Sequence, residues 1–385
     1  MSTTDTDVGG AITLTDDELD PYVTHTGTRH RLTDPGLPGD GTLLGFGTLR
    51  EHGLRRLADL AVDAEKLAGE LSDQLVIGAL RNLDRDLESI VLDGMTGEVS
   101  TTYGHRNAAL MDLSPLAPSL EALLRFAAAT EELTAFRGPF GPKAVAEASD
   151  RLTAVFEHGA GGHVPPYWRM AALIRPLARI AGPGDGLVLD LPKRLLDEEF
   201  GSGGIMRFED VDFPTTLTHE PTRRFLRETG LPEDGLLFQL DTEVPLPALT
   251  EYYADERPGD FSADELPATA DRLIRLGCLV EDTSLVVDGT TGAVLAWSEP
   301  DLTLRPLNAD ISTLAFTLWL LHREKTLEAT HDLTDAYEQL AATMTQTLAT
   351  VDPVACDPTP LLEGDDGRRY WPEIFEDEAG GALYA

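Results

Sequence analysis

Alternating and helical hydrophobic patterns divide the chain into strands that precede long helices. Two apolar runs, residues 90–92 and 285–287, each lead into an Asp-Gly pair, and apolar residues resume at Val99 and Val294. Asp-Gly supplies the positive φ angles that tight turns require, so each block predicts an antiparallel hairpin. Apolar residues at helical spacing predict four later helices. These helices are expected over residues 119–136, 144–157, 312–326 and 333–350.

The whole pattern occurs twice. A Thr-His-x-x-Thr-Arg motif begins at Thr24 and again at Thr218, an offset of 194 residues (218 minus 24). From these positions to residues 43 and 237, 11 of 20 positions are identical. An Asp-Gly-x-Thr-Gly motif begins at Asp93 and again at Asp288, an offset of 195 residues. A period this long indicates a duplicated domain, because solenoid repeats recur every ~20–50 residues.

The order of the elements predicts the fold class of both copies. Strands that are followed by helices, and do not alternate with them, favour an α+β fold with helices beside an antiparallel or mixed sheet. The predicted first domain covers residues 11–157 and the second covers 187–350. Residues 158–186 form a predicted linker that begins with a glycine-rich segment and contains one helical stretch.

The two ends of the chain differ from the domains in composition. Residues 1–10 are small and polar, which predicts a disordered tail, and residues 351–385 form an acidic tail. The acidic tail carries Tyr370, Trp371 and Phe375. It is therefore open whether the tail packs onto the body, binds a partner or stays disordered.

Charge is the feature of the composition that most restricts function. The chain has 67 acidic and 30 basic residues, a formal net charge of −37. Such a surface repels nucleic acids and anionic membranes, because binding to polyanions depends on Lys and Arg. It attracts a basic partner and accelerates that encounter. The alternative is that a uniformly acidic surface only maintains solubility.

The remaining composition predicts a cytoplasmic protein. Cys278 and Cys356 are too few for a disulfide framework and have no metal-binding spacing, which suits a reducing compartment. The first residues lack the basic stretch and apolar core of a signal peptide. No apolar run approaches the ~18 residues of a membrane span.

Motifs for cofactor and metal chemistry are absent from the sequence. It has no Gly-x-x-x-x-Gly-Lys loop for phosphates, and the Gly-rich segment 182–186 precedes an apolar run and contains Pro183. It also lacks the His-x-Glu and Pro-Cys-x-x-Cys pair of zinc deaminases. His158 and His163 have no third ligand nearby in the sequence. We therefore predict no cofactor, no metal and no catalytic residues.

The duplicated histidines and aspartates have two interpretations. His25 and His219, with Asp93 and Asp288, could serve an unrecognised hydrolase. We favour structural roles, in which Thr-His caps a helix and the aspartates shape turns. The arginines of the motif, Arg29 and Arg223, would then pair with nearby carboxylates.

Several blocks of the second copy resemble the SUKH superfamily of bacterial immunity proteins, most closely the fourth subfamily. The blocks run from Phe208 through the Thr-His-x-x-Thr-Arg motif, the Gly-Leu-Pro at Gly230 and the Asp-Gly hairpin. They end with Asn308 and the helix at Ser312, where two residues separate Asn308 from the helix entry. The first copy is similar but more divergent, since Asp-Leu-Ser precedes its helix.

The resemblance implies two α+β domains without catalytic residues that neutralise a toxin by occupying its active face. Such toxins are commonly nucleases or nucleic-acid deaminases, whose basic clefts an acidic protein can fill. The alternative is a regulatory scaffold that uses the same fold to bind another protein.

Partner contacts are expected where the copies diverge, roughly over residues 241–267. This stretch contains an aromatic and acidic group of the kind that interfaces favour. The predicted contact residues are Tyr252, Tyr253, Asp255 and Glu256. The alternative is the end of a surface helix with two half-buried tyrosines. The two copies could also associate as a pseudo-dimer within one chain.

Overall fold

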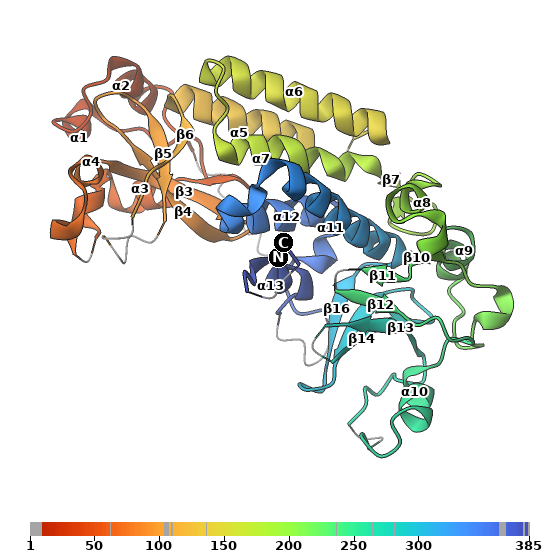
Figure 1. Ribbon diagram of the computed structural model, residues 1–385. Helices are drawn as coiled ribbons and strands as arrows, with labels where there is room; N and C mark the ends of the chain where they lie inside the picture. The colour runs from red at the N-terminus through yellow and green to blue at the C-terminus, as the bar shows by residue number, and fades with distance from the viewer. Residues whose placement is uncertain are drawn as a thin grey trace, which may run out of the picture. The chain divides into compact units, whose positions relative to one another are not determined.

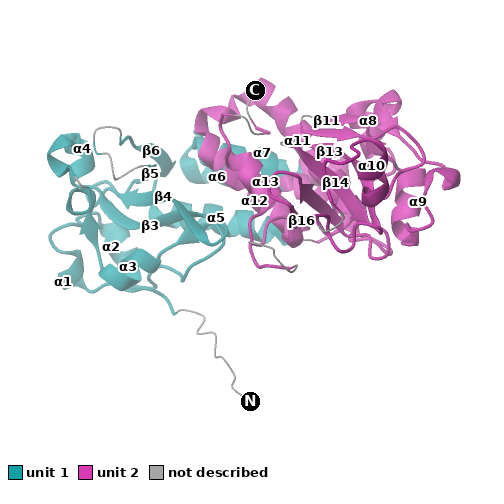
Figure 2. Ribbon diagram, turned by 90° about the horizontal axis from the view of Figure 1, so that it is seen from below, with its two compact units in different colours: residues 1–135, 147–175 teal, residues 136–146, 176–385 magenta. Residues whose placement is uncertain are grey.

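The protein consists of two compact units in a computed structural model (Figure 2). Unit 1 comprises residues 1–135 and 147–175, and unit 2 comprises residues 136–146 and 176–385. The structure describes residues 10–61, 63–103, 108, 111–135, 137–235, 237–262, 265–280, 282–361, 367–379 and 382–383. The predicted tail at residues 1–10 lies, except for Gly10, outside the described residues.

Unit 1 is built on an antiparallel sheet with the strand order β1-β3-β4-β5-β6, and β2 also pairs with β3 (Figure 1). The strands are β1 (Leu44–Gly45), β2 (Arg55–Arg56), β3 (Leu75–Asn82), β4 (Arg85–Leu92), β5 (Val99–Thr102) and β6 (Ser114–Ala117). The predicted hairpin is confirmed, since β4 and β5 pair antiparallel with Leu92 opposite Val99.

The helices of unit 1 are short before strand β3 and long after strand β6. The short ones are α1 (Asp16–Leu19), α2 (Thr26–Thr33), α3 (Gly47–His52) and α4 (Gly69–Ser72). The long ones are α5 (Leu120–Thr134), α6 (Pro142–Ala160), which belongs to unit 1 from Glu147 onward, and α7 (Pro166–Ile174). Ser119 begins α5 by accepting a hydrogen bond from the amide of Ala122. A side-chain oxygen at this position satisfies a backbone donor that the helix leaves unpaired.

The last three helices of unit 1 lie side by side beside its sheet (Figure 1). Trp168 of α7 is fully buried, and its ring centroid lies 5.6 Å from that of Phe126 and 5.3 Å from that of Phe156. Its indole nitrogen donates to the carbonyl of Leu116 at the end of β6. The helical part of the predicted linker, residues 158–186, therefore contributes to the core of unit 1.

The opposite face of the unit 1 sheet has a separate apolar cover. Val76 and Val91 point to this side and pack with Leu57, Leu67 and Leu71. These leucines come from the loop that contains η1 (Leu57–Asp59), η2 (Ala64–Lys66) and α4. Both faces of the sheet are thus buried, although by elements of different length.

Unit 2 has an antiparallel sheet with the order β11-β12-β13-β14-β15-β16. The strands are β11 (Asp234–Gly235), β12 (Phe238–Leu240), β13 (Leu273–Leu279), β14 (Thr283–Asp288), β15 (Val294–Ser298) and β16 (Thr303–Asn308). The predicted second hairpin is confirmed, because β14 and β15 pair antiparallel with Val287 opposite Val294. Two-stranded pairs join β7 (Gly182–Pro183) to β8 (Leu189–Asp190) and β9 (Ile205–Met206) to β10 (Leu231–Pro232).

The helices of unit 2 follow the same plan as those of unit 1. They are α8 (Leu195–Phe200), α9 (Glu220–Glu228), α10 (Leu249–Asp255), α11 (Ile311–His331), α12 (Tyr337–Val351) and α13 (Tyr370–Glu376). The carboxylate of Asp310 begins α11 by accepting from the amides of Ser312 and Thr313. Helices beside antiparallel sheets in both units confirm the predicted α+β class.

The C-terminal segment packs onto unit 2. Trp371 and Phe375 of α13 are fully buried. The hydroxyl of Tyr337 on α12 donates to the carbonyl of Asp377 at 2.8 Å. Of the three possibilities that the sequence leaves open for the acidic tail, the described part of it is docked on the body.

Candidate functional site

The two repeated motifs of the first copy meet in space. Thr24 and His25 lie just before α2, and their amides both donate to the carbonyl of Gly94, at 2.8 and 3.0 Å. Gly94 belongs to the turn between β4 and β5. We call this assembly, a Thr-His helix start joined to an Asp-Gly-x-Thr-Gly turn, the His–turn unit.

The second copy has the same assembly at the start of α9. The amides of Thr218 and His219 donate to the carbonyl of Gly289, at 2.7 and 2.9 Å. Gly289 lies in the turn between β14 and β15. Residues about seventy positions apart in the sequence are therefore joined identically in both copies.

Each histidine side chain is held within its own His–turn unit. The Nδ1 atom of His25 lies 2.8 Å from Thr28 Oγ1 and accepts from the Thr28 amide at 3.3 Å. The Nδ1 atom of His219 lies 2.8 Å from Thr222 Oγ1. Histidine here takes the N-cap position, which Ser, Thr, Asp and Asn usually occupy.

The last glycine of each turn packs against the ring of the histidine. Gly97 and Gly292 have φ angles of +82° and +79°, a region that favours glycine. A Cβ atom at Gly97 would lie 2.4 Å from the Nδ1 of His25, and one at Gly292 would lie 2.3 Å from that of His219. The repeated glycines are therefore required by both the backbone angle and the contact with the ring.

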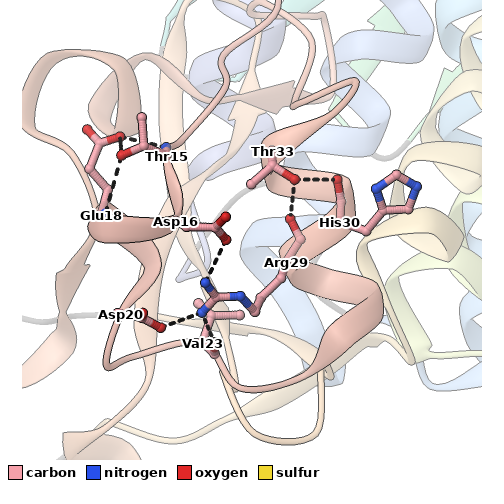
Figure 3. A network of polar contacts seen from close by, with 8 residues as sticks. All are labelled: Thr15, Asp16, Glu18, Asp20, Val23, Arg29, His30 and Thr33. Atoms are coloured by element: carbon pink, nitrogen blue, oxygen red, sulfur yellow. Dashed lines mark hydrogen bonds and ion pairs between the residues drawn. The ribbon is translucent and has the colours of Figure 1, made fainter.

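In each copy the repeated arginine forms ion pairs with the segment that precedes the His–turn unit. Arg29 donates to Asp16 and Asp20, each at 2.6 Å, and to the carbonyl of Val23 at 2.9 Å (Figure 3). Hydrogen bonds from the guanidinium to Asp16 and then Asp20 raise the pKa of Arg29.

Arg223 makes a looser version of the same contacts in the second copy. It lies 3.4 Å from Asp210 and 3.9 Å from Glu220. Its guanidinium also lies 5.2 Å from the ring centroid of Phe213. Asp16 and Asp210 occupy equivalent positions, so one ion pair recurs with the duplication.

The repeated aspartates shape the turns. Oδ1 of Asp93 accepts from the amides of Met95 and Thr96, at 2.7 and 2.9 Å. Oδ1 of Asp288 accepts from Thr290 and Thr291, and its Oδ2 accepts from Arg272 Nε at 3.1 Å.

The repeated aspartates and the repeated histidines therefore make their hydrogen bonds to different residues. Burial alone would raise the pKa of Asp288, but the hydrogen bonds from Thr290 and Thr291 and the charge of Arg272 lower it overall. Among the described residues, no hydrogen bond joins His219 to Asp288. His219 bonds to Thr222, and Asp288 bonds to the two threonines of its turn. This geometry gives no support to a catalytic His–Asp pair.

The predicted partner-contact residues lie on and just after α10, beside the unit 2 sheet. Tyr253 is only 3% exposed. Its hydroxyl donates to Glu299 Oε1 at 2.8 Å and accepts from the indole nitrogen of Trp297 at 3.1 Å. Burial, followed by the hydrogen bond to Glu299, raises the pKa of Tyr253.

Tyr253 is enclosed by the fold of unit 2, so the accessible side chains of the predicted group are the other three. Tyr253 belongs to the apolar cluster under α10, together with Leu249, Leu273 and Trp297. Tyr252 is partly exposed, and Asp255 and Glu256 are exposed.

Two arginines that the sequence argument missed organise this region. The guanidinium carbon of Arg275 lies 3.9 Å from the ring centroid of Tyr252, and Arg275 also pairs with Asp241. Arg257 pairs with Asp260 at 2.7 Å and with Glu299. For Arg257 the available signal was its position among acidic residues, whereas Arg275 lies in an apolar strand that gives no such signal.

A buried polar network links β16 to the C-terminal segment. The side-chain amide of Asn308 donates to Asp352 at 2.9 Å and to Thr317 at 3.1 Å. Its oxygen accepts from the indole nitrogen of Trp371 at 3.0 Å. Burial raises the pKa of Asp352, although the amide of Ala309 opposes this effect. Asn308 therefore joins the sheet, α11, the end of α12 and α13.

Unit 2 also contains a pocket of about 400 Å³ between α8, α11, β11 and α13. Its lining is mainly apolar, with charged groups at several positions. The lining residues are Glu199, Phe200, Asp234, Gly235, Leu237, Leu318, Leu321, His322, Lys325 and Trp371. The Nδ1 atom of His322 lies 2.9 Å from Oε1 of Glu199, within hydrogen-bond distance.

Metal and membrane features can be assessed for the described part of the chain. Within it, no three His, Cys, Asp or Glu side chains gather closely enough to hold a metal ion. Of the helices that the structure describes, none has the length and apolar character needed to cross a bilayer.

Comparison with known proteins identifies the family. The family model described as SUKH-4 immunity protein matches residues 6–159 and 191–377, which together are most of the chain. No curated protein and no solved structure matches the chain. Each matched segment contains one copy of the His–turn unit. The chain therefore belongs to the SUKH-4 immunity protein family, which implies an immunity role with a protein toxin as partner.

Proposed function

We propose that this protein neutralises a basic toxin domain, a nuclease or a nucleic-acid deaminase, by covering its active face. The observation that carries the proposal is the family match over both copies in a chain of net charge −37. A toxin that grips nucleic acid presents a basic cleft, and an acidic protein is complementary to it. Location in the cytoplasm, where such a toxin would act, is part of the same proposal.

The proposed mechanism is occlusion and not chemistry. In both copies the duplicated histidine and aspartate are engaged within the His–turn unit, as scaffold residues would be. Binding over the toxin's cleft would exclude its nucleic-acid substrate without any covalent step. Electrostatic attraction would mainly accelerate association, and buried contacts would slow dissociation.

In unit 2 the exposed side of α10 is the proposed contact surface. Tyr252, Asp255 and Glu256 supply an aromatic ring and two carboxylates, with the ring stacked on Arg275. Partly exposed tyrosines are frequent centres of binding energy in protein interfaces. The double variant Tyr252→Ala/Glu256→Gln should weaken toxin binding, while Tyr253→Phe, inside the fold, should not.

The test of the function is affinity capture of the tagged protein from its own cells at low and at moderate salt. Mass spectrometry then identifies the proteins retained. One basic partner with a nuclease or deaminase domain, retained less at moderate salt, is the expected result. A diverse set of partners, or none, would refute the proposal and favour the regulatory scaffold.

The captured toxin domain, once purified, allows a direct assay of occlusion. Addition of this protein at equal concentration should abolish cleavage or deamination of nucleic acid. A complex that remains fully active would contradict occlusion, even if binding is tight.

A further inference from the structure

Two exposed positions in or beside the His–turn unit carry large side chains in the first copy. Tyr22 and Met95 of the first copy are 41% and 77% exposed. At the offsets of 194 and 195 residues, their equivalents in the second copy are Thr216 and Thr290, which are also exposed. At these two positions only the first copy carries large side chains, whereas the second copy carries threonines.

Tyr22 and Met95 belong to one part of the surface. A Cβ atom at Gly94 would lie 2.0 Å from the carbonyl oxygen of Tyr22, so the chain at Tyr22 lies directly against the turn. Met95 is the next residue of that turn, and its amide donates to Asp93. Neither side chain is buried in the core, whereas Val23, between Tyr22 and Thr24, is fully buried.

Four acidic residues lie in the segment that leads to Tyr22. Asp16, Asp17 and Glu18 form the first turn of α1, and Asp20 follows it. The side chains of Asp16 and Asp20 are 76% and 68% exposed, although both pair with Arg29 (Figure 3). Arg56 also lies within electrostatic range of Tyr22, but it pairs with Asp59. The four acidic residues of the preceding segment outnumber Arg29, so the charge around Tyr22 is negative overall.

We propose that this Tyr22 surface, defined as Tyr22, Met95, Asp16, Asp17 and Asp20, is a contact site of unit 1 for the basic toxin. The matching toxin surface would present an apolar depression ringed by Lys or Arg side chains. Large exposed side chains inside a charged rim are typical of interface centres. The inference rests on the proposed function and adds to it that the first copy contributes contacts of its own.

The second copy provides the test variant. Tyr22→Thr/Met95→Thr installs the residues that an equivalent turn already carries, so folding should be retained. The probe is the catalytically inactive toxin domain purified from the capture experiment, and calorimetry or surface binding measures its Kd. We expect the Kd to rise at least 30-fold, with an unchanged unfolding midpoint, because loss of an interface centre has effects of about that size.

A matched control is Val211→Thr in the second copy. Val211 is 80% exposed and apolar, lies outside both turns, and occupies in the second copy the position of Asp17. The Kd of the Val211→Thr protein for the toxin domain should stay within about twofold of the Kd of the unmodified protein. If the Tyr22→Thr/Met95→Thr protein also stays within twofold while the unmodified protein binds, the inference is wrong and the proposed function stands. If the unmodified protein captures no toxin, both fail.

The contribution of the aspartates of the Tyr22 surface is tested by a separate measurement of the association rate. Asp17→Lys reverses one exposed charge at the start of α1. At low salt the association rate should fall at least threefold, while the dissociation rate changes little. Equal association rates at low salt would overturn the assignment of this surface to a basic partner.

Discussion

The contact between His219 and Gly292 allows a quantitative test of the His–turn unit. Gly292→Ala places a methyl group 2.3 Å from the Nδ1 of His219 and 2.9 Å from Thr222 Oγ1, at a φ of +79°. A left-handed backbone angle costs a non-glycine residue roughly 1–2 kcal/mol. The ring must also move, which breaks a hydrogen bond worth about 1 kcal/mol and forces an unfavourable rotamer at a further ~1 kcal/mol.

The two contributions can be separated with a matched control. Gly259 has a φ of +92°, but a Cβ atom there meets nothing within 4 Å. Gly259→Ala should therefore lose only the backbone contribution, about 1–2 kcal/mol. Gly292→Ala should lose about 3–4 kcal/mol, so that the two variants differ by about 2 kcal/mol.

Urea denaturation followed by tryptophan fluorescence suits this comparison. Three of the four tryptophans, Trp297, Trp319 and Trp371, lie in unit 2, so the signal reports mainly on that unit. Equal losses of unfolding free energy in the two variants would refute the reasoning, since the contact with His219 would then contribute nothing.

Three further predictions concern unit 2. Tyr253→Phe removes the hydroxyl between Glu299 and Trp297, so the unfolding free energy should fall by about 1–2 kcal/mol in urea denaturation, with toxin affinity unchanged. Trp371→Ala should destabilise unit 2 by about 3–5 kcal/mol and increase hydrogen exchange at the end of α12, because the ring is fully buried against Asn308; unchanged exchange would contradict docking of the tail. Glu324 is fully buried, neither of its carboxylate oxygens has a hydrogen-bond partner in the described structure, and burial, then Glu328, raises its pKa to about 8. The folded state thus retains a proton that the unfolded state loses above about 4.5, so this contribution to stability is present below pH 4.5 and is lost as the pH rises to about 8. Glu324→Gln should reduce the loss of unfolding free energy between pH 4.5 and 8. Stability profiles that fall in parallel for the two proteins would show that Glu324 does not cause this loss.

Local features were predictable from the sequence because they depend on neighbouring residues. Asp-Gly specifies the hairpin turns, and helical spacing predicts α5 and α11 to within a few residues at their starts. The pairing of Thr218 with Gly289 depends on contacts across about seventy residues, which no local pattern encodes. Both blocks nevertheless recur at nearly the same offset, which was an available signal that they form one structure.

Burial was harder to predict than secondary structure. Tyr252 and Tyr253 are adjacent and chemically identical, yet one lies under Arg275 and the other bonds Trp297 and Glu299 inside the fold. Which of them is buried depends on where β15 passes beneath α10. In the same way, Trp371 in an acidic segment is buried because Asn308 offers an acceptor 63 residues earlier in the chain.

Duplication explains why the repeated blocks and the proposed contacts lie at different positions. A residue that occurs in both copies must satisfy the same packing twice, as Gly97 and Gly292 do against their histidines. Positions that only one copy fills with large exposed side chains are free of that requirement. Tyr22 differs from Thr216 although the Thr-His pair that follows each of them makes the same backbone hydrogen bonds. Partner specificity can therefore change at such positions without any change in the scaffold, and the two copies of one fold can contribute different contacts to a single toxin.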